Sequence, residues 1–196
     1  MPRSMREQMI LEVAGRAFAE AGYERASMDR IAQLAEISKP MLYAYFGSKE
    51  GLYVAYIERT GADLVARLVR ADRPHAPHSV RLRALTAEFF CFVAEHRDGW
   101  TVLFMEMNAS RPLAEQVAHL RERIVTEIRR MLEEGSESWA GLAPPASDGV
   151  AHAIVGAGDS LANWWLKHPD VGRDEVAEWY AGLAQAAITS AVSAHR

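Results

Sequence analysis

The spacing of apolar residues is the feature that most limits the fold of this chain. Apolar side chains recur every three or four positions along the 196 residues, and the two-residue alternation of an amphipathic strand is nearly absent. Ile10, Val13 and Phe18, for example, share one face of a helix that we expect over residues 5–21, with Gly22 as its stop signal. The pattern therefore predicts an all-α protein.

Start and stop signals divide the chain into further helices. Ser27, Ser38 and Ser48 each stand where a serine side chain can cap a helix N-terminus. Two prolines in the segment "DRPHAPH" end the helix that begins near Ser48. The expected helices after the first cover residues 27–35, 38–46, 48–70, 79–97, 99–108, 111–134, 147–167 and 173–193.

Composition and charge narrow the class of protein. The chain is 49% hydrophobic, carries a net charge of -4, and has neutral charge balance over residues 1–50, with 7 Lys/Arg and 7 Asp/Glu. Any attraction to a polyanion must therefore come from local placement of charge. The single cysteine, Cys91, excludes an internal disulfide. No stretch approaches the ~20 apolar residues of a membrane span, and the start lacks the apolar region of a secretory signal, so we expect a cytoplasmic protein without a membrane partner.

The stretch "ISKPMLYAYFGSKEG" places much aromatic surface on a segment too short to be a core helix of its own. Two short helices joined by two or three residues, with a third helix before them, have the spacing of a helix-turn-helix, whose second helix lies in the DNA major groove. Leu42 and Phe46 are four residues apart and should face the core. Pro40, Met41 and Tyr43 then point away from it.

An exposed face of this kind suits DNA better than water. Apolar groups such as Pro40 and Met41 can contact thymine methyls, Lys39 can donate to guanine, and tyrosine hydroxyls can hold phosphates. Free backbone N–H groups at helix N-termini also favour phosphates. For Tyr43 or Tyr45 taken alone, packing against the next helix is an equal alternative.

Residues 18–53, "FAEAGYERASMDRIAQLAEISKPMLYAYFGSKEGLY", resemble the DNA-binding domain of the TetR family of transcriptional regulators. The resemblance implies a DNA-binding domain over residues 1–50 and a helical effector-binding and dimerisation domain over residues 51–196. It also implies a homodimer that represses transcription at a palindromic operator until a small hydrophobic effector binds, with no cofactor. The DNA-contacting residues that it implies are Ser27, Ser38, Lys39, Pro40, Met41, Tyr43, Tyr45 and Lys49.

One position departs from the family pattern. Glu36 stands in the turn between the two short helices, where the family usually has glycine. If this residue has a left-handed backbone conformation, a glutamate there costs ~1 kcal/mol relative to glycine.

The rest of the chain suggests two roles that the sequence separates only partly. Small residues line the last two helices and favour close helix packing, either in a dimer interface or within the monomer: Ala151, Val155, Gly158, Ala162, Ala177, Ala181, Ala184, Ala187 and Ala191. Aromatic and methionine side chains with a few polar groups could line an effector pocket, although each alone could be plain core. The candidate ligand-binding residues are Phe89, Phe92, Trp100, Phe104, Met107, Asp159, Asn163 and Trp164, with Asp159 either a buried anchor or a rim residue.

Two other classes of function remain as alternatives. Glu115, His119 and Glu122 share a helix face and could begin a metal site, but a carboxylate-bridged di-metal bundle needs matching Glu-x-x-His pairs from two helices, and no partner is evident. No phosphate-binding loop or nucleophile elbow is present, so we expect no enzyme and no catalytic or metal-ligating residues. A helical interaction module without a DNA target is the second alternative.

Overall fold

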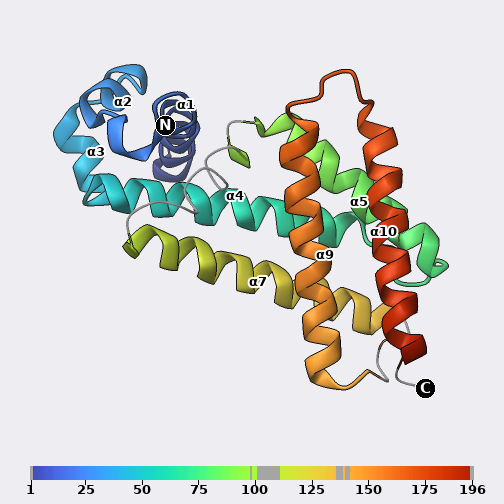
Figure 1. Ribbon diagram of the computed structural model, residues 1–196. Coiled ribbons are helices and arrows are strands. Elements are labelled where there is room, and N and C mark those ends of the chain that lie inside the picture. Colours follow the sequence, from blue (N-terminus) through green and yellow to red (C-terminus); the bar gives the residue numbers. More distant parts are fainter. Residues whose placement is uncertain (1, 98, 101–110, 136–138, 140–141, 195–196) are drawn as a thin grey trace. The chain divides into compact units, whose positions relative to one another are not determined.

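The structure is a computed structural model that describes residues 2–97, 99–100, 111–135, 139 and 142–194. Within these residues the secondary structure is helical throughout, which confirms the all-α prediction. The helix expected over residues 99–108 lies outside the described residues except at its start. The helices, labelled as in Figure 1, are α1 (Arg3–Arg25), α2 (Met28–Leu34), α3 (Lys39–Phe46), α4 (Lys49–Ala71), α5 (His78–Glu95), α7 (Arg111–Gly135), α9 (Pro144–Trp165) and α10 (Arg173–Ala194).

The chain forms two compact units. The first comprises Met1–Ala62 with His96–Leu120, and the second comprises Asp63–Glu95 with Arg121–Arg196. Helix α4 therefore contributes residues to both units. The functional boundary that we expect after residue 50 stays a prediction, since compactness divides the chain later, inside α4.

The first unit is built around the aromatic side chain of Phe18 on α1. Its ring meets that of Tyr53 on α4 edge-on, with 5.1 Å between the centroids. Ile31 on α2 and Leu42 on α3 are completely buried, as the apolar pattern predicts. At Gly22 the backbone takes φ 73° and ψ 163°, so α1 is interrupted there and makes one further turn to Arg25.

Serine caps set the starts of the next three helices. The side chains of Ser27, Ser38 and Ser48 each accept a hydrogen bond from the backbone N–H three residues later, at 3.4, 3.3 and 2.9 Å. Such caps satisfy backbone donors that a helix leaves unpaired at its N-terminus. All three predicted caps are confirmed.

In the turn between α2 and α3, Glu36 has the left-handed backbone conformation that is less favourable for glutamate than for glycine. Glu36 has φ 53° and is the only non-glycine residue with positive φ in the part of the chain that the structure describes. The N–H of the next residue, Ile37, donates to the carbonyl of Ala32 at 3.0 Å and closes the end of α2. The turn is therefore left-handed in spite of its side chain.

The second unit packs α10 along α5 and α9. The rings of Phe90 and Trp165 meet edge-on at 5.5 Å, and Tyr180 donates its hydroxyl hydrogen to the carbonyl of Ile154 at 2.8 Å. Most of the small residues singled out in the sequence are buried inside this unit, so they serve the monomer first: Ala151, Gly158 and Ala162 of α9, and Ala177, Ala181 and Ala184 of α10.

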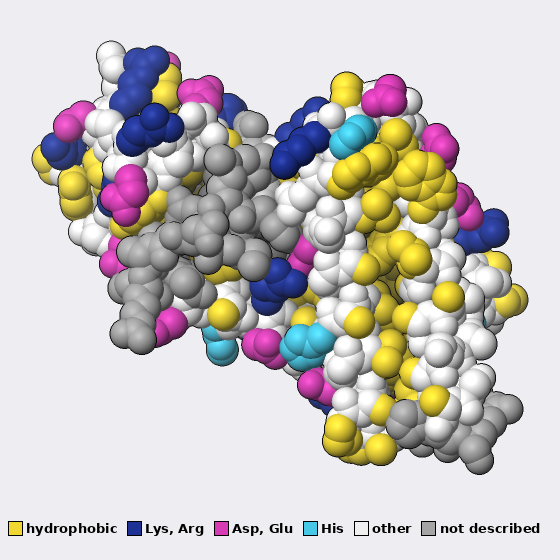
Figure 2. Space-filling model, viewed as in Figure 1, with side chains coloured by type: hydrophobic (Ala, Val, Ile, Leu, Met, Phe, Trp, Pro, Cys, Tyr) yellow, Lys and Arg dark blue, Asp and Glu magenta, His cyan; other side chains and the backbone are white. Residues whose placement is uncertain are grey.

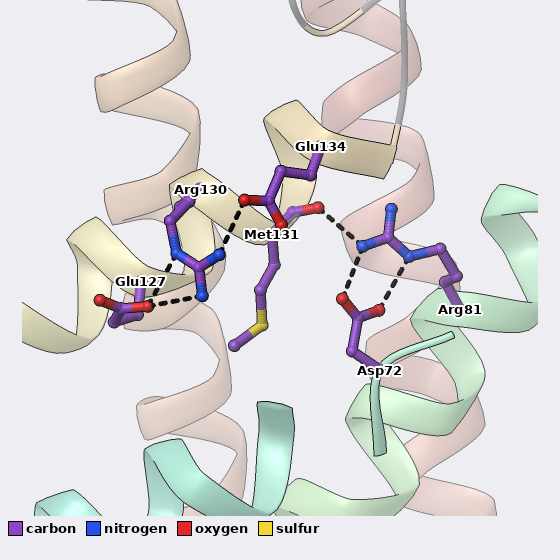
Figure 3. Close-up of polar contacts among 6 residues, drawn as sticks. All are labelled: Asp72, Arg81, Glu127, Arg130, Met131 and Glu134. Carbon is purple, nitrogen blue, oxygen red and sulfur yellow. Dashed lines mark hydrogen bonds and ion pairs between the residues drawn. The ribbon is translucent and has the colours of Figure 1, made fainter. Parts of the chain in front are cut away.

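A buried arginine ties three segments of the second unit together (Figure 3). Arg81 on α5 donates from Nε and Nη2 to the two carboxylate oxygens of Asp72, at 2.8 and 2.7 Å. Its Nη2 also donates to the carbonyl of Met131 on α7, at 2.8 Å. The two side chains are 2% and 10% exposed. Because both charges are desolvated, each depends on the other for stability.

Replacing Glu36 by glycine should stabilise the protein by about 1 kcal/mol, because glycine has no Cβ to oppose a positive φ. The free energy of unfolding from urea denaturation measures the effect. Glu36→Ala is the matched control: it removes the same carboxylate but keeps the Cβ, so we expect no comparable gain. Equal stabilities of the glycine and alanine variants would contradict this account.

Asp72→Asn should destabilise the protein by about 3 kcal/mol or more, because it leaves the buried Arg81 charge without its partner. Glu134→Gln is the matched control, since this carboxylate also accepts from an arginine, Arg130, at 2.7 Å but lies on the surface (Figure 3). The urea midpoint should move strongly for the first variant and little for the second. Similar shifts for both variants would show that burial of the Arg81 pair is not what matters.

Candidate nucleic-acid interface and effector cavity

The outward face of α3 is the candidate DNA-reading surface. Leu42 is fully buried against the unit, whereas Pro40, Met41 and Tyr43 are exposed. Phe46, expected to face inward, is half-buried. The helix therefore presents the apolar and phenolic groups that the sequence analysis assigned to DNA, on a side that the rest of the unit leaves open.

Lys39, at the start of α3, is paired across the turn with α2. Its Nζ lies 2.9 Å from a carboxylate oxygen of Asp29, and both side chains are exposed. The hydrogen bond to Asp29 raises the pKa of the Lys39 ammonium. An exposed pair of this kind is weak, so it positions the ammonium without preventing exchange for another acceptor.

Two arginines that the sequence analysis did not single out lie beside this surface. The Arg3 guanidinium is 5.3 Å from the centroid of the Tyr45 ring, and Nη1 of Arg6 is 4.0 Å from the sulfur of Met41. Both belong to the first turns of α1, three residues apart. Their spacing on one helix face was visible in the sequence, but their proximity to α3 depends on tertiary structure.

Lys49 holds two segments of the first unit together in this structure. Its ammonium donates to the carbonyl of Glu24 at 2.9 Å and lies 4.7 Å from the centroid of the Tyr23 ring. It thus joins the end of α1 to the start of α4. The phosphate contact expected of Lys49 stays a prediction, as do those of Ser27 and Ser38, whose hydroxyls cap helices.

The second unit contains a cavity of about 60 Å³. Its walls come from five helices and are almost entirely apolar, with only Thr86 and Tyr180 carrying polar side-chain atoms. The lining residues are Leu68, Leu82, Leu85, Thr86, Phe89, Ile128, Met131, Leu132, Ile154, Tyr180 and Ala184.

Among the expected ligand-binding residues that the structure describes, Phe89 lines this cavity and the others do not. Phe92 is fully buried, with the Arg67 guanidinium 5.5 Å from its ring centroid. Trp100 is buried in the first unit. Asn163 is half-buried and Trp164 is exposed, whereas Phe104 and Met107 lie outside the described residues. The apolar face of α7, which supplies Ile128, Met131 and Leu132, was not considered as a wall.

Asp159 lies in the middle of α9 and is mostly but not completely buried, so it stands between its two predicted placements. It forms an ion pair with Arg121 of α7, and the two side chains are 14% and 32% exposed. Burial raises the pKa of Asp159 to about 7, although the Arg121 charge opposes that rise. The carboxyl therefore exchanges between its ionised and its neutral form near pH 7.

An apolar patch covers one side of α9 and α10 in the second unit (Figure 2). Trp164, Trp179 and Leu183 are 39%, 43% and 56% exposed, and we call these three residues the α9–α10 patch. The two tryptophan ring centroids are 6.1 Å apart, and Trp164 stacks on His168. Neighbouring aromatic side chains exposed on one face are typical of protein interaction sites.

Two further properties bear on the function. None of the helices in the described ranges is long and apolar enough to span a lipid bilayer. In the same ranges no three His, Cys, Asp or Glu side chains are grouped so as to hold a metal ion. Glu115, His119 and Glu122 are accordingly not grouped in this way in the part of the chain that the structure describes.

Comparison with known proteins agrees with this arrangement. Residues 10–56 match the family model of bacterial regulatory proteins of the tetR family, and residues 78–187 match that of the tetracyclin repressor-like C-terminal domain. The HTH-type transcriptional activator FasR of Mycolicibacterium smegmatis is 29% identical over 196 residues, which cover 96% of this chain and 88% of that protein.

Solved structures show the same fold. A TetR-like transcriptional regulator from Rhodococcus sp. RHA1 superposes with a TM-score of 0.75 at 34% identity, covering 94% of this chain and 96% of that one. FadR of Bacillus subtilis, solved in complex with stearoyl-CoA, has a TM-score of 0.75 at 18% identity and covers 95% and 97% of the two chains. The matching families and relatives are regulators and not enzymes. The chain belongs to the TetR family of transcriptional regulators, with an N-terminal helix-turn-helix and a C-terminal helical domain.

Proposed function

We propose that the protein is a dimeric repressor that binds a palindromic operator and is released from it by a small hydrophobic effector. The observation that carries the proposal is the outward face of α3. A helix whose buried side is fixed by Leu42 leaves Pro40, Met41 and Tyr43 exposed to solvent. Apolar exposure of this kind is unfavourable in water, but it is useful against the thymine methyl groups of a major groove.

Contacts to DNA divide into base readout and backbone positioning. We assign base readout to Lys39, Pro40 and Met41. Tyr43 and Tyr45 donate hydroxyl hydrogens to phosphates, and Lys49 joins them after it releases the Glu24 carbonyl. Ser27 and Ser38 add the free N–H groups of the helix N-termini that they cap.

Arg3 and Arg6 extend this positively charged surface. Their guanidinium groups already touch Tyr45 and Met41, so they lie beside groups assigned to DNA. Because the first 50 residues carry no net charge, such local placement of cations is what attracts a polyanion. We assign both arginines to phosphate oxygens.

A second copy of the chain is the partner that the α9–α10 patch fits. Exposed tryptophans and a leucine on two adjacent helices can be covered by the same patch of another copy in a two-fold interface. Gly156 and Gly182 of these helices have open space where a Cβ would stand, which permits close approach. Two α3 helices held roughly 34 Å apart would then match successive major grooves, hence the palindrome.

The cavity of the second unit supports an apolar effector. Ligand sites usually measure on the order of 300–1,000 Å³, so a cavity of about 60 Å³ must widen when an effector enters. Leu68 of α4 is part of its wall, while Leu52 and Tyr53 of the same helix belong to the core of the DNA-binding unit. Displacement of α4 is therefore the route by which an effector would change DNA affinity, and DNA would weaken effector binding by the same factor.

The sign of regulation has a specific alternative. FasR, which aligns with nearly the whole chain, is named an activator. Transcription in vitro from a promoter that overlaps the operator decides between the two. Lower transcript levels with the protein support the repressor, and higher levels establish an activator with the same DNA-reading surface.

Lys39→Ala should relax preference at one operator base pair, lowering discrimination on the order of tenfold, because the ammonium reads a guanine edge. Tyr43→Phe should weaken binding to all sequences alike, because it removes a phosphate contact. Fluorescence anisotropy with a set of single-base operator variants measures both effects. Lys167→Ala, which removes a lysine from the second unit, is the matched control. Unchanged base preference in Lys39→Ala would refute the assignment of base readout.

Leu183→Asp should shift the protein from dimer to monomer at micromolar concentration, because it places a charge in the centre of the proposed apolar interface. Sedimentation equilibrium measures the mass. Leu34→Asp is the matched control, since Leu34 is an exposed leucine on α2, outside the α9–α10 patch. A dimer that tolerates the aspartate at 183 would place the interface elsewhere.

A further inference from the structure

Among the described residues that line the cavity, no side chain has a hydrogen-bond donor left to orient a ligand. Thr86 Oγ1 already donates to the carbonyl of Arg83 at 3.2 Å, and the Tyr180 hydroxyl donates to that of Ile154 at 2.8 Å. Effector sites normally combine an apolar wall with a few polar groups that fix orientation. The orienting group must therefore lie at an end of the cavity.

The Arg81–Asp72 pair lies beside one part of the cavity wall. Leu82 and Met131 line the cavity, and the adjacent Arg81 side chain is 2% exposed and engaged with Asp72 and the Met131 carbonyl. Phe89 lies two helical turns farther along α5, about 10 Å away by helical rise. The wall residues of α5 thus extend over two turns, and the arginine beside Leu82 is already fully engaged.

The Arg121–Asp159 ion pair lies near Tyr180, a residue of the cavity wall. Phe89, another wall residue, packs against Tyr180, with 5.8 Å between ring centroids. The Tyr180 hydroxyl lies against Gly158 of α9, where a Cβ would collide with it, and the next residue is Asp159. Burial and the Asp159 charge both raise the pKa of the Tyr180 phenol, in keeping with this proximity. Arg121 lies two turns before Ile128 on the same face of α7.

We propose that the Arg121–Asp159 pair is the anion-binding end of the cavity. An elongated apolar effector with one terminal carboxylate would place its chain among α5, α7, α9 and α10, and its carboxylate would take the place of Asp159 on the Arg121 guanidinium. This inference rests on the proposed effector function of the cavity. Arg121 is 32% exposed, so a ligand group can reach it from solvent, whereas Arg81 is sealed.

The replacement of Asp159 by a ligand carboxylate on Arg121 leaves no buried charge without a partner. A guanidinium fork binds any carboxylate bidentately, so the effector's group replaces that of Asp159 with little loss to Arg121. The displaced Asp159 carboxyl takes one proton from solvent and remains buried as a neutral group, which its pKa of about 7 allows. The groups that face it in the described residues are Arg121 from α7 and Tyr180 from α10. The ion pair therefore occupies the position that a ligand carboxylate would fill.

Calorimetric titration of the full chain with decanoate and with decan-1-ol tests the proposal, since the two probes share a chain and differ in the head group. The wild-type protein should bind decanoate about tenfold or more tightly than the alcohol, as expected for hydrogen bonds to a charged group. Arg121→Gln should abolish this preference without changing affinity for the alcohol. Arg129→Gln is the matched control, because Arg129 is also on α7, is 33% exposed and pairs with a carboxylate, that of Glu133.

Asp159→Asn keeps Arg121 and removes its competitor, so it should bind decanoate more tightly than the wild type does. A purely structural role for Asp159 would not produce such a gain. Equal affinity of the wild type for both probes, or a decanoate preference that survives Arg121→Gln, would overturn the anion-binding end and leave the apolar cavity in place. Binding of neither probe would overturn the effector function of the cavity and this inference with it.

Discussion

Helices α2 and α3 contain seven and eight residues, a length at which an isolated helix is unstable in water. They exist because Ile31 and Leu42 are buried in the first unit and because serine side chains satisfy their first N–H groups. This dependence fixes which side of α3 faces inward. The opposite side of α3 does not pack against the rest of the unit, so its residues are not selected for burial. Pro40, Met41 and Tyr43 lie on that side. The same constraint that folds the helix thus defines the face that we propose to read DNA.

The second unit differs from the first in that charged side chains lie close to its apolar cavity. Two arginine–aspartate pairs lie close to residues of the cavity wall, but they differ in accessibility: Arg81 with Asp72 is sealed, and Arg121 with Asp159 is partly open. The sealed pair joins the end of α4 to α5 and, through the Met131 carbonyl, to α7. It therefore holds in place three of the helices that form the cavity wall. The open pair leaves one end of the same wall able to change partners.

The features that the sequence predicted best are those that depend on residues close by in the chain. Helix limits, the serine caps and the inward orientation of Leu42 follow from periodicity and capping chemistry. The family pattern pointed to Glu36 as an unusual residue, but whether its backbone is left-handed stayed open. Contacts between distant segments were missed. Lys49 reaches a carbonyl 25 residues away, and Arg6 reaches Met41 35 residues away. Periodicity tells which face of a helix is buried but not against which partner. The α7 wall of the cavity was therefore not predicted, and for the small residues the dimer interface and packing within the monomer both stayed open.

The narrowness of the cavity has a consequence for the concentration at which the regulator would respond. An effector that needs more than about 60 Å³ binds only the fraction of molecules whose walls are open, and its apparent dissociation constant rises as that fraction falls. Substitutions that loosen the wall would then lower the response threshold without touching any group that contacts the effector. Sensitivity and chemical selectivity can therefore evolve separately in this fold, the first through packing and the second through the charged end.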